Sequence, residues 1–129
     1  VLGQPTDEQR RFFEAMRAMQ EVGFAAVRAG RRCCDVDEAV QGWAQAHGLD
    51  RWVLHHTGHA FGLEGHEAPF LDLGDATELR PGMFFTIEPG LYVPGLGGFR
   101  HSDTVLVADG GCEVLTYYPR DLESLTLPV

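Results

Sequence analysis

The first fifty residues place apolar side chains with the period of an α-helix. The apolar members of the first stretch, spaced mostly by three and four residues, are Phe12, Met16, Met19, Val22, Ala26 and Val27. This spacing predicts an amphipathic helix whose apolar stripe, its two methionines included, faces a core. Thr6 and Gln9 form a capping-box pattern at its start, and Gly30 is predicted to end it.

A second helical pattern follows. Asp35 and Glu38 repeat the capping arrangement and predict a helix that begins at Asp35 and ends at Gly48. The apolar stripe of this helix consists of Val36, Ala39, Val40 and Trp43.

From residue 52 the pattern changes to that of β-strands. Short runs rich in β-branched and aromatic residues, separated by glycine and proline, lie at 52–56, 83–88, 90–93, 99–107 and 113–118. They predict strands, with Asp109-Gly110-Gly111 as a hairpin turn and residues 64–80 as a polar connection. Helices followed by antiparallel strands predict an α+β fold, in which two helices pack on one face of a curved antiparallel sheet.

Composition narrows the classes of partner. Ten basic residues against nineteen acidic residues give a net charge of −9. Such a surface repels phosphate backbones and anionic lipids, so we expect neither nucleic-acid nor membrane binding. Three cysteines without a CxxC pair predict reduced thiols, and no apolar run reaches the roughly 20 residues that span a bilayer. These features predict a cytoplasmic protein.

The candidate chemistry begins with the stretch HHTGHAFGLEGHE at 55–67. Its histidines, at 55, 56, 59 and 66, are suited to proton transfer and to metal ligation, and their spacing differs from the helical HExxH zinc signature. Glu88 ends the run FFTIE, where strand alternation places it on the face of Phe84 and Thr86. From these residues alone, Glu88 is either a solvated carboxylate or a metal ligand or general base.

Three ordered segments carry a resemblance to a known family. HTGHAFGLEGHEAP, RPGMFFTIEPGLYVP and GGFRHSDTVLV resemble, in order and spacing, the C-terminal half of the pita-bread hydrolases. This superfamily includes Xaa-Pro dipeptidase (prolidase), aminopeptidase P, methionine aminopeptidase and creatinase. The likeness is to the prolidase and aminopeptidase P branch and covers nearly the whole chain. It implies that residues 1–129 are the C-terminal part of one pita-bread catalytic domain.

The resemblance implies a centre of one or two divalent cations, Mn, Co, Zn or Fe. The family's histidine ligand falls on His59 and its first glutamate ligand on Glu88, which also exchanges a proton with the attacking water. His66 matches a histidine that contacts the scissile carbonyl, and His55 matches one that lines the substrate site. Arg100 matches an arginine beside the last carboxylate ligand, and we expect it to contribute to substrate binding.

Two departures from the family pattern stand out. The family's two aspartate ligands lie upstream of the segment that aligns with the opening VLGQP, so we expect this chain to be an incomplete part of a longer polypeptide. Ser102 stands where the second glutamate ligand is usual, which predicts a weakened second metal site. His101 and Asp103 are poor substitutes, because strand alternation points both to the face opposite Arg100 and Ser102.

The resemblance leads us to expect an Xaa-Pro dipeptidase or aminopeptidase. Such an enzyme cleaves small peptides before proline with a metal-activated water, and by analogy it is a homodimer. Two alternatives stay open: a creatinase-like, metal-independent hydrolase of a C–N bond in a small substrate, and a catalytically impaired member of the family.

Overall fold

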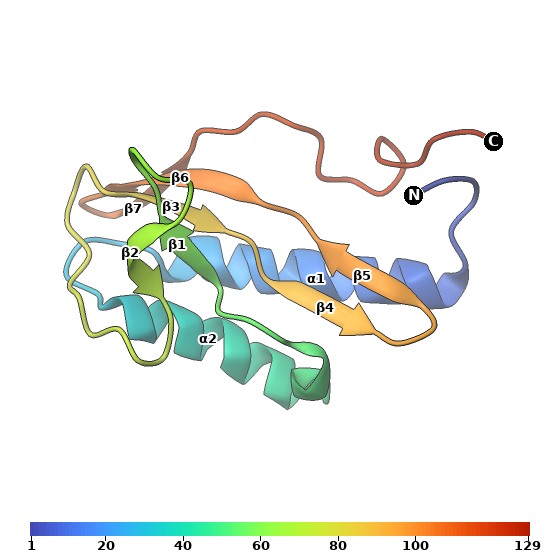
Figure 1. Ribbon diagram of the computed structural model, residues 1–129, viewed down its shortest axis with the longest axis horizontal. Coiled ribbons are helices and arrows are strands. Elements are labelled where there is room, and N and C mark those ends of the chain that lie inside the picture. The colour runs from blue at the N-terminus through green and yellow to red at the C-terminus, as the bar shows by residue number, and fades with distance from the viewer.

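The computed structural model describes all residues 1–129. Two helices, α1 (Asp7–Ala26) and α2 (Cys33–Ala46), are followed by a short 3₁₀ helix, η1 (Asp50–Trp52). The strands are β1 (Gly58–Ala60), β2 (Glu67–Leu71), β3 (Phe84–Ile87), β4 (Gly90–Val93), β5 (Gly97–Arg100), β6 (Asp103–Ala108) and β7 (Gly111–Val114). Figure 1 shows both helices on the same side of the strands, which is the predicted α+β arrangement.

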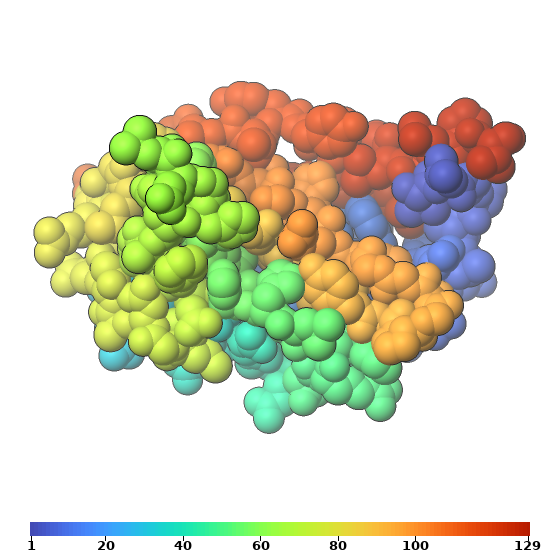
Figure 2. Space-filling model, in the orientation of Figure 1, coloured from blue at the N-terminus to red at the C-terminus, as the bar shows by residue number.

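The strands form two antiparallel sheets. The larger sheet has the order β2-β1-β3-β6-β7, and β4 pairs with β5 in a two-stranded sheet. Ala108 pairs with Gly111 across the Asp109–Gly110 turn, so the predicted hairpin is present. The two ends of the chain meet, because the Leu127 amide donates to the Val1 carbonyl, and Figure 2 shows the blue and red ends in contact.

The core lies between the helices and one face of the strands. Phe85 and Ile87 are fully buried toward the helices, whereas Phe84 is 42% exposed and Thr86 and Glu88 are partly exposed. The period-two assignment of this strand is therefore confirmed. Met16 and Met19, at 1% and 0% exposure, belong to the core as predicted. Neither helix contains a stretch long and apolar enough to cross a membrane.

The helix boundaries differ from the predictions at two points. The Thr6–Gln9 capping box is present, but α1 ends at Ala26, before Gly30. The second helix begins at Cys33, so the prediction of a start at Asp35 was wrong. The amides of Cys33 and Cys34 donate to the carbonyls of Thr77 and Asp75, and this distant segment satisfies the first turn.

Asp35 closes the start of α2 from inside the first turn. Its carboxylate accepts from the Arg32 amide at 2.9 Å and from the Arg32 guanidinium at 2.6 Å. These hydrogen bonds lower the pKa of Asp35 to about 2. The residue is therefore used to stabilise the helix and is not available as a metal ligand.

Three strand predictions need correction. Residues 52–56 do not form a strand, since the chain leaves η1 and enters the sheet only at Gly58. Strand β2 lies inside the predicted 64–80 connection, where pairing with β1 overrides the weak local preference. The predicted 113–118 strand is the shorter β7, which begins at Gly111 and ends at Val114.

The predicted strand at 99–107 is broken into β5 and β6. Ile87 pairs with Asp103 on one side of the break, and Gly90 pairs with Arg100 on the other. Residues 88–89 on one side and 101–102 on the other lie between these pairs. Continuing the register places Glu88 opposite Ser102. Pro89 has no amide hydrogen to donate, which accounts for the interrupted ladder at this point.

Candidate metal centre

Three side chains that are distant in sequence converge on the sheet face away from the helices. His59 comes from β1, His66 from the loop before β2, and Glu88 from the end of β3. One ligand atom from each lies within 4.8 Å of the other two. Sequence analysis had assigned His59 and Glu88 as metal ligands and His66 as a substrate contact. The structure places all three close enough to share one ion.

The His59 imidazole is buried and held in one orientation. Its Nδ1 lies 2.9 Å from the Ala60 carbonyl, which only accepts, so Nδ1 carries the proton. In the neutral ring, Nε2 then presents a lone pair to the Glu88 Oε1, 2.9 Å away. Two acceptors at this distance repel each other unless a proton or a cation lies between them. The donor set of imidazole nitrogens and a carboxylate therefore fits a divalent transition metal.

The Glu88 carboxylate is positioned by its neighbours in the sheet. The Glu88 amide donates to the Thr57 carbonyl at 2.8 Å. The Thr86 hydroxyl accepts from the His59 amide at 3.0 Å and lies 3.3 Å from Glu88 Oε1. One threonine therefore links the strand that carries the histidine to the carboxylate.

A buried carboxylate supports this arrangement from α2. Asp37 accepts from the amide and the hydroxyl of Thr57 at 2.9 and 2.7 Å, and from the Leu73 amide at 3.2 Å. Burial raises the pKa of Asp37, and the hydrogen bonds from Thr57 oppose that rise. Asp37 is therefore occupied by the backbone that holds Glu88 and is not free to bind a metal.

His66 is exposed, and its ring lies against that of His59, with centroids 4.0 Å apart. The 61–66 loop that precedes β2 projects from the strands in Figures 1 and 2. This placement leaves the His66 imidazole free to contact an ion or a substrate.

His55 lies outside this cluster. Its Nδ1 faces the His56 carbonyl and its Nε2 faces the Tyr92 hydroxyl, both at 2.8 Å. A side chain at Gly90 would collide with the His55 Nε2 and the Tyr92 hydroxyl, so this pair covers the strand two residues beyond Glu88. Sequence reasoning missed Tyr92. Strand alternation places Gly90 and Tyr92 on one face, so this signal was present in the sequence.

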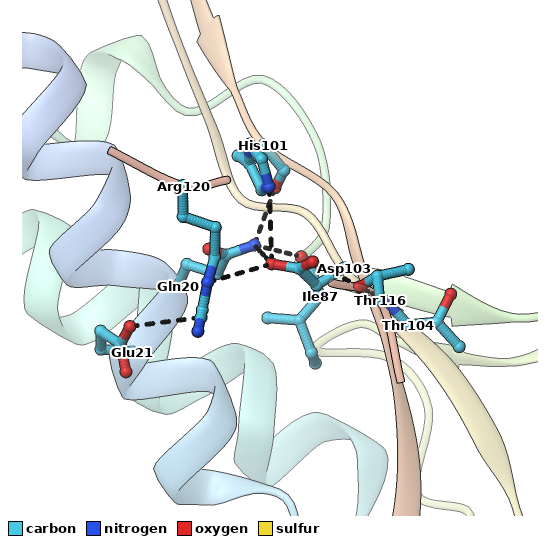
Figure 3. A network of polar contacts seen from close by, with 8 residues as sticks. All are labelled: Gln20, Glu21, Ile87, His101, Asp103, Thr104, Thr116 and Arg120. Atoms are coloured by element: carbon cyan, nitrogen blue, oxygen red, sulfur yellow. Dashed lines mark hydrogen bonds and ion pairs between the residues drawn. The ribbon is translucent and has the colours of Figure 1, made fainter. Parts of the chain in front are cut away.

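Arg100 is the last residue of β5, Ser102 lies in the break between β5 and β6, and both are exposed. Arg100 is in none of the ion pairs of the structure, and Ser102 in none of its side-chain hydrogen bonds. Asp103 is 1% exposed and points toward α1, where it accepts from Gln20 (Figure 3). His101 lies beside it, with Nε2 3.6 Å from Asp103 Oδ2. The prediction that His101 and Asp103 face away from Ser102 is confirmed.

The α+β layer presents two histidines and a glutamate together from its open sheet face, a set of side chains that could hold a metal ion. Comparison with known families gives the particular class. Residues 1–109 match the metallopeptidase family M24, and the chain belongs to this family. The resemblance to the pita-bread fold is thereby confirmed.

Individual relatives agree with this assignment. The chain is 37% identical to the Xaa-Pro dipeptidase of Pyrococcus furiosus over 95% of its own length and 35% of the relative. Among solved structures it resembles the dipeptidase PepE of Mycobacterium ulcerans, with 34% identity and a TM-score of 0.93. That match covers 100% of this chain and 34% of the other. The chain thus spans about a third of the length of the relatives it matches.

The fold extends to more distant proteins. The N-terminal domain of the FACT complex subunit SPT16 from Eremothecium gossypii has a TM-score of 0.88 at 20% identity. The match covers 100% of this chain and 31% of the SPT16 chain. A likeness at this identity concerns the fold alone, so functional inference depends on the site residues.

Proposed function

We propose that the protein to which this chain belongs is a metal-dependent peptidase that cleaves Xaa-Pro dipeptides or removes a residue before proline. The observation that carries the proposal is the contact between His59 Nε2 and Glu88 Oε1 at 2.9 Å, with His66 in reach of the same point. The relatives include proteins named Xaa-Pro dipeptidase, which supports this choice of substrate.

His59 and Glu88 would hold the cation, with His66 able to approach it. When bound, a divalent cation lowers the pKa of a coordinated water and polarises the scissile carbonyl. The Glu88 carboxylate is the group in this chain placed to take a proton. Its Oε1 is engaged by His59 and Thr86, whereas Oε2 has no hydrogen-bond partner and can receive the proton.

The surrounding side chains would bind and orient the peptide. His66 is exposed beside His59 and can donate a hydrogen bond to the carbonyl oxygen as negative charge develops there. His55 is held by Tyr92 and lines the neighbouring strand. The Arg100 guanidinium has no carboxylate partner, so it is free to pair with an anionic group of a substrate.

The number of cations depends on position 102. Ser102 supplies no negative charge opposite Glu88, so we propose one firmly held cation and a weakened second site. Two aspartates from an upstream part of the same catalytic domain would complete the centre. A homodimer and a cytoplasmic location stay predictions.

A second candidate is a hydrolase that works without metal on a C–N bond of a small substrate. The direct approach of His59 to Glu88 favours it, since a protonated imidazole would satisfy the carboxylate at 2.9 Å without a cation. Full activity in the presence of a chelator would select this candidate.

The test of the proposal is His59→Ala in the full-length protein. We expect bound metal and hydrolysis of Gly-Pro to be lost together, with activity reduced at least a hundredfold, because the buried nitrogen ligand is removed. Metal content is measured by mass spectrometry and hydrolysis by release of proline.

His47→Ala is the matched control. His47 is exposed beyond the end of α2, with its ring on Trp43, so this variant should keep metal and activity. Metal-dependent turnover that survives in His59→Ala would exclude the ligand role of this histidine.

A further inference from the structure

A buried polar network lies behind the strands that carry Glu88 and Ser102 (Figure 3). Gln20 of α1 and Asp103 of β6 are each 1% exposed. The Gln20 Nε2 lies 3.1 Å from the Ile87 carbonyl, 3.0 Å from the His101 carbonyl and 3.1 Å from Asp103 Oδ2. One amide group therefore contacts both strands at once.

These contacts fall where the strand ladder is interrupted. Ile87 and His101 immediately precede Glu88 and Ser102, and no backbone pairing joins residues 88–89 to 101–102. The Gln20 amide contacts the carbonyl of Ile87, the last residue of β3 that pairs with β6, and the His101 carbonyl, which lies in the unpaired gap. The peptide group between Ile87 and Glu88 is thereby held at both ends, by Gln20 on its carbonyl and by the Thr57 carbonyl on its amide.

Asp103 keeps the Gln20 amide in one orientation. Its carboxylate accepts from the Thr116 hydroxyl, and the Arg120 Nε lies 3.8 Å away. Arg120 is itself held by Glu21 at 3.4 Å and lies over the Phe24 ring. The His101 Nε2 approaches Asp103 to 3.6 Å and has no hydrogen-bond partner. Because the Asp103 carboxylate is fixed from several sides, the Gln20 amide that donates to it is held in a single orientation.

Core stability does not in general require buried charged groups. Replacing buried charged groups with apolar side chains of similar volume often leaves the stability of a protein unchanged or increases it. The network instead contributes directed hydrogen bonds to the two peptide groups that carry the site positions, which apolar side chains cannot supply.

We infer that Gln20 and Asp103 are positioning residues that set the place of the Glu88 carboxylate relative to His59, and that keep position 102 opposite it. Neither residue touches the ion or the substrate. The inference rests on the proposed function for its metal readout, and a second readout without metal keeps the two separable.

Gln20→Met in the full-length protein is the first test. Methionine is unbranched and similar in length but donates no hydrogen bond, so the Ile87–Glu88 peptide is released. We expect Co²⁺ to bind about tenfold or more weakly, as for other changes in groups that orient ligands, with an altered visible absorption spectrum. Asp103→Asn, which keeps the shape and removes the charge, should weaken Co²⁺ binding in the same direction and serves if Gln20→Met fails to fold.

Leu122→Ala is the control for a loss of core packing. Leu122 is 4% exposed and packs in the cluster that contains Met16 and Met19, without a side-chain hydrogen bond to the strands. It should lower stability and leave the Co²⁺ affinity and spectrum unchanged. Equal weakening of Co²⁺ binding in the control at matched stability, or unchanged binding in Gln20→Met, would overturn the inference.

The metal-free readout is the amide NMR spectrum of the unloaded protein. Gln20→Met should shift the Glu88 and Ser102 amide resonances, and Leu122→Ala should leave them in place. If the unchanged protein binds no Co²⁺, the proposed function fails, and this spectrum still decides the positioning role. Unmoved Glu88 and Ser102 resonances in Gln20→Met would reject it.

Discussion

At the scale of single residues, the proposed number of cations depends on Ser102. The register on both sides of the strand break places it directly opposite Glu88. Directly opposed residues in antiparallel strands share a face, with Cβ atoms about 4.5–5.5 Å apart. A carboxylate at this position would lie beside Glu88, whereas the serine hydroxyl adds no charge. If the centre holds cations as proposed, the residue at position 102 would set how many it can hold.

Ser102→Glu is expected to raise the number of bound cations per chain from one toward two, because it supplies a second carboxylate opposite Glu88. In chelator the same change should destabilise the fold by up to about 1 kcal/mol through repulsion of like charges. Metal analysis and denaturant unfolding measure the two effects. Ser102→Gln introduces a side chain of the same size as glutamate but without charge. It should change neither the number of bound cations nor the stability in chelator. An unchanged metal stoichiometry in Ser102→Glu would contradict our account of this position.

At the scale of elements, the site depends on how closely β1 approaches β3. A Cβ on Gly58 would stand 1.9 Å from the Thr86 carbonyl oxygen, so only glycine permits this approach. The approach also brings the His59 amide to the Thr86 hydroxyl, and the imidazole to Glu88. A short strand of three residues is thereby enough to place a buried candidate ligand, His59.

Gly58→Ala should force β1 away from β3 and destabilise the protein by about 1–3 kcal/mol, the usual range for overpacking. Metal affinity should fall with it, because His59 moves with the strand. Gly42→Ala is the matched control: Gly42 lies in α2 with open space around it, so alanine should stabilise the helix by up to about 1 kcal/mol. Denaturant unfolding compares the two variants, and a stability for Gly58→Ala equal to that of the unchanged protein would refute the close approach.

At the scale of the whole molecule, the candidate ligands come from three segments, and both helices support them from behind. Asp37 of α2 holds Thr57, which holds Glu88, and Gln20 of α1 holds the other side of the same peptide. The cation would therefore join parts of the chain that are separate in the unfolded state. Binding to the folded state alone stabilises it by mass action.

Mn²⁺ at 100 times its dissociation constant should stabilise the intact protein by about 2.7 kcal/mol, provided the unfolded chain does not bind it. Thermal unfolding in Mn²⁺ and in chelator measures this difference. His59→Ala should abolish it. Equal unfolding temperatures with and without Mn²⁺ in the unchanged protein would count against a resident cation.

Much of the fold was predictable because its signals are local. The capping box at Thr6, the apolar stripe through Met16 and Met19, and the alternation from Phe84 to Glu88 depend on neighbouring residues. The same holds for the candidate ligands His59 and Glu88, whose motifs are short. The start of α2, strand β2 and the break at 101–102 were not predicted, since each is decided by contacts with distant segments.

The order of residues along the chain specifies the class of fold, the family resemblance and the residue types available to a metal. Only the tertiary structure decided that His66 joins His59 and Glu88, that Tyr92 holds His55, and that Gln20 spans the strand break. The physical reason is range. Hydrogen bonding and side-chain periodicity act over a few residues, whereas a ligand set and its supports are defined by distances between strands and helices that only packing establishes.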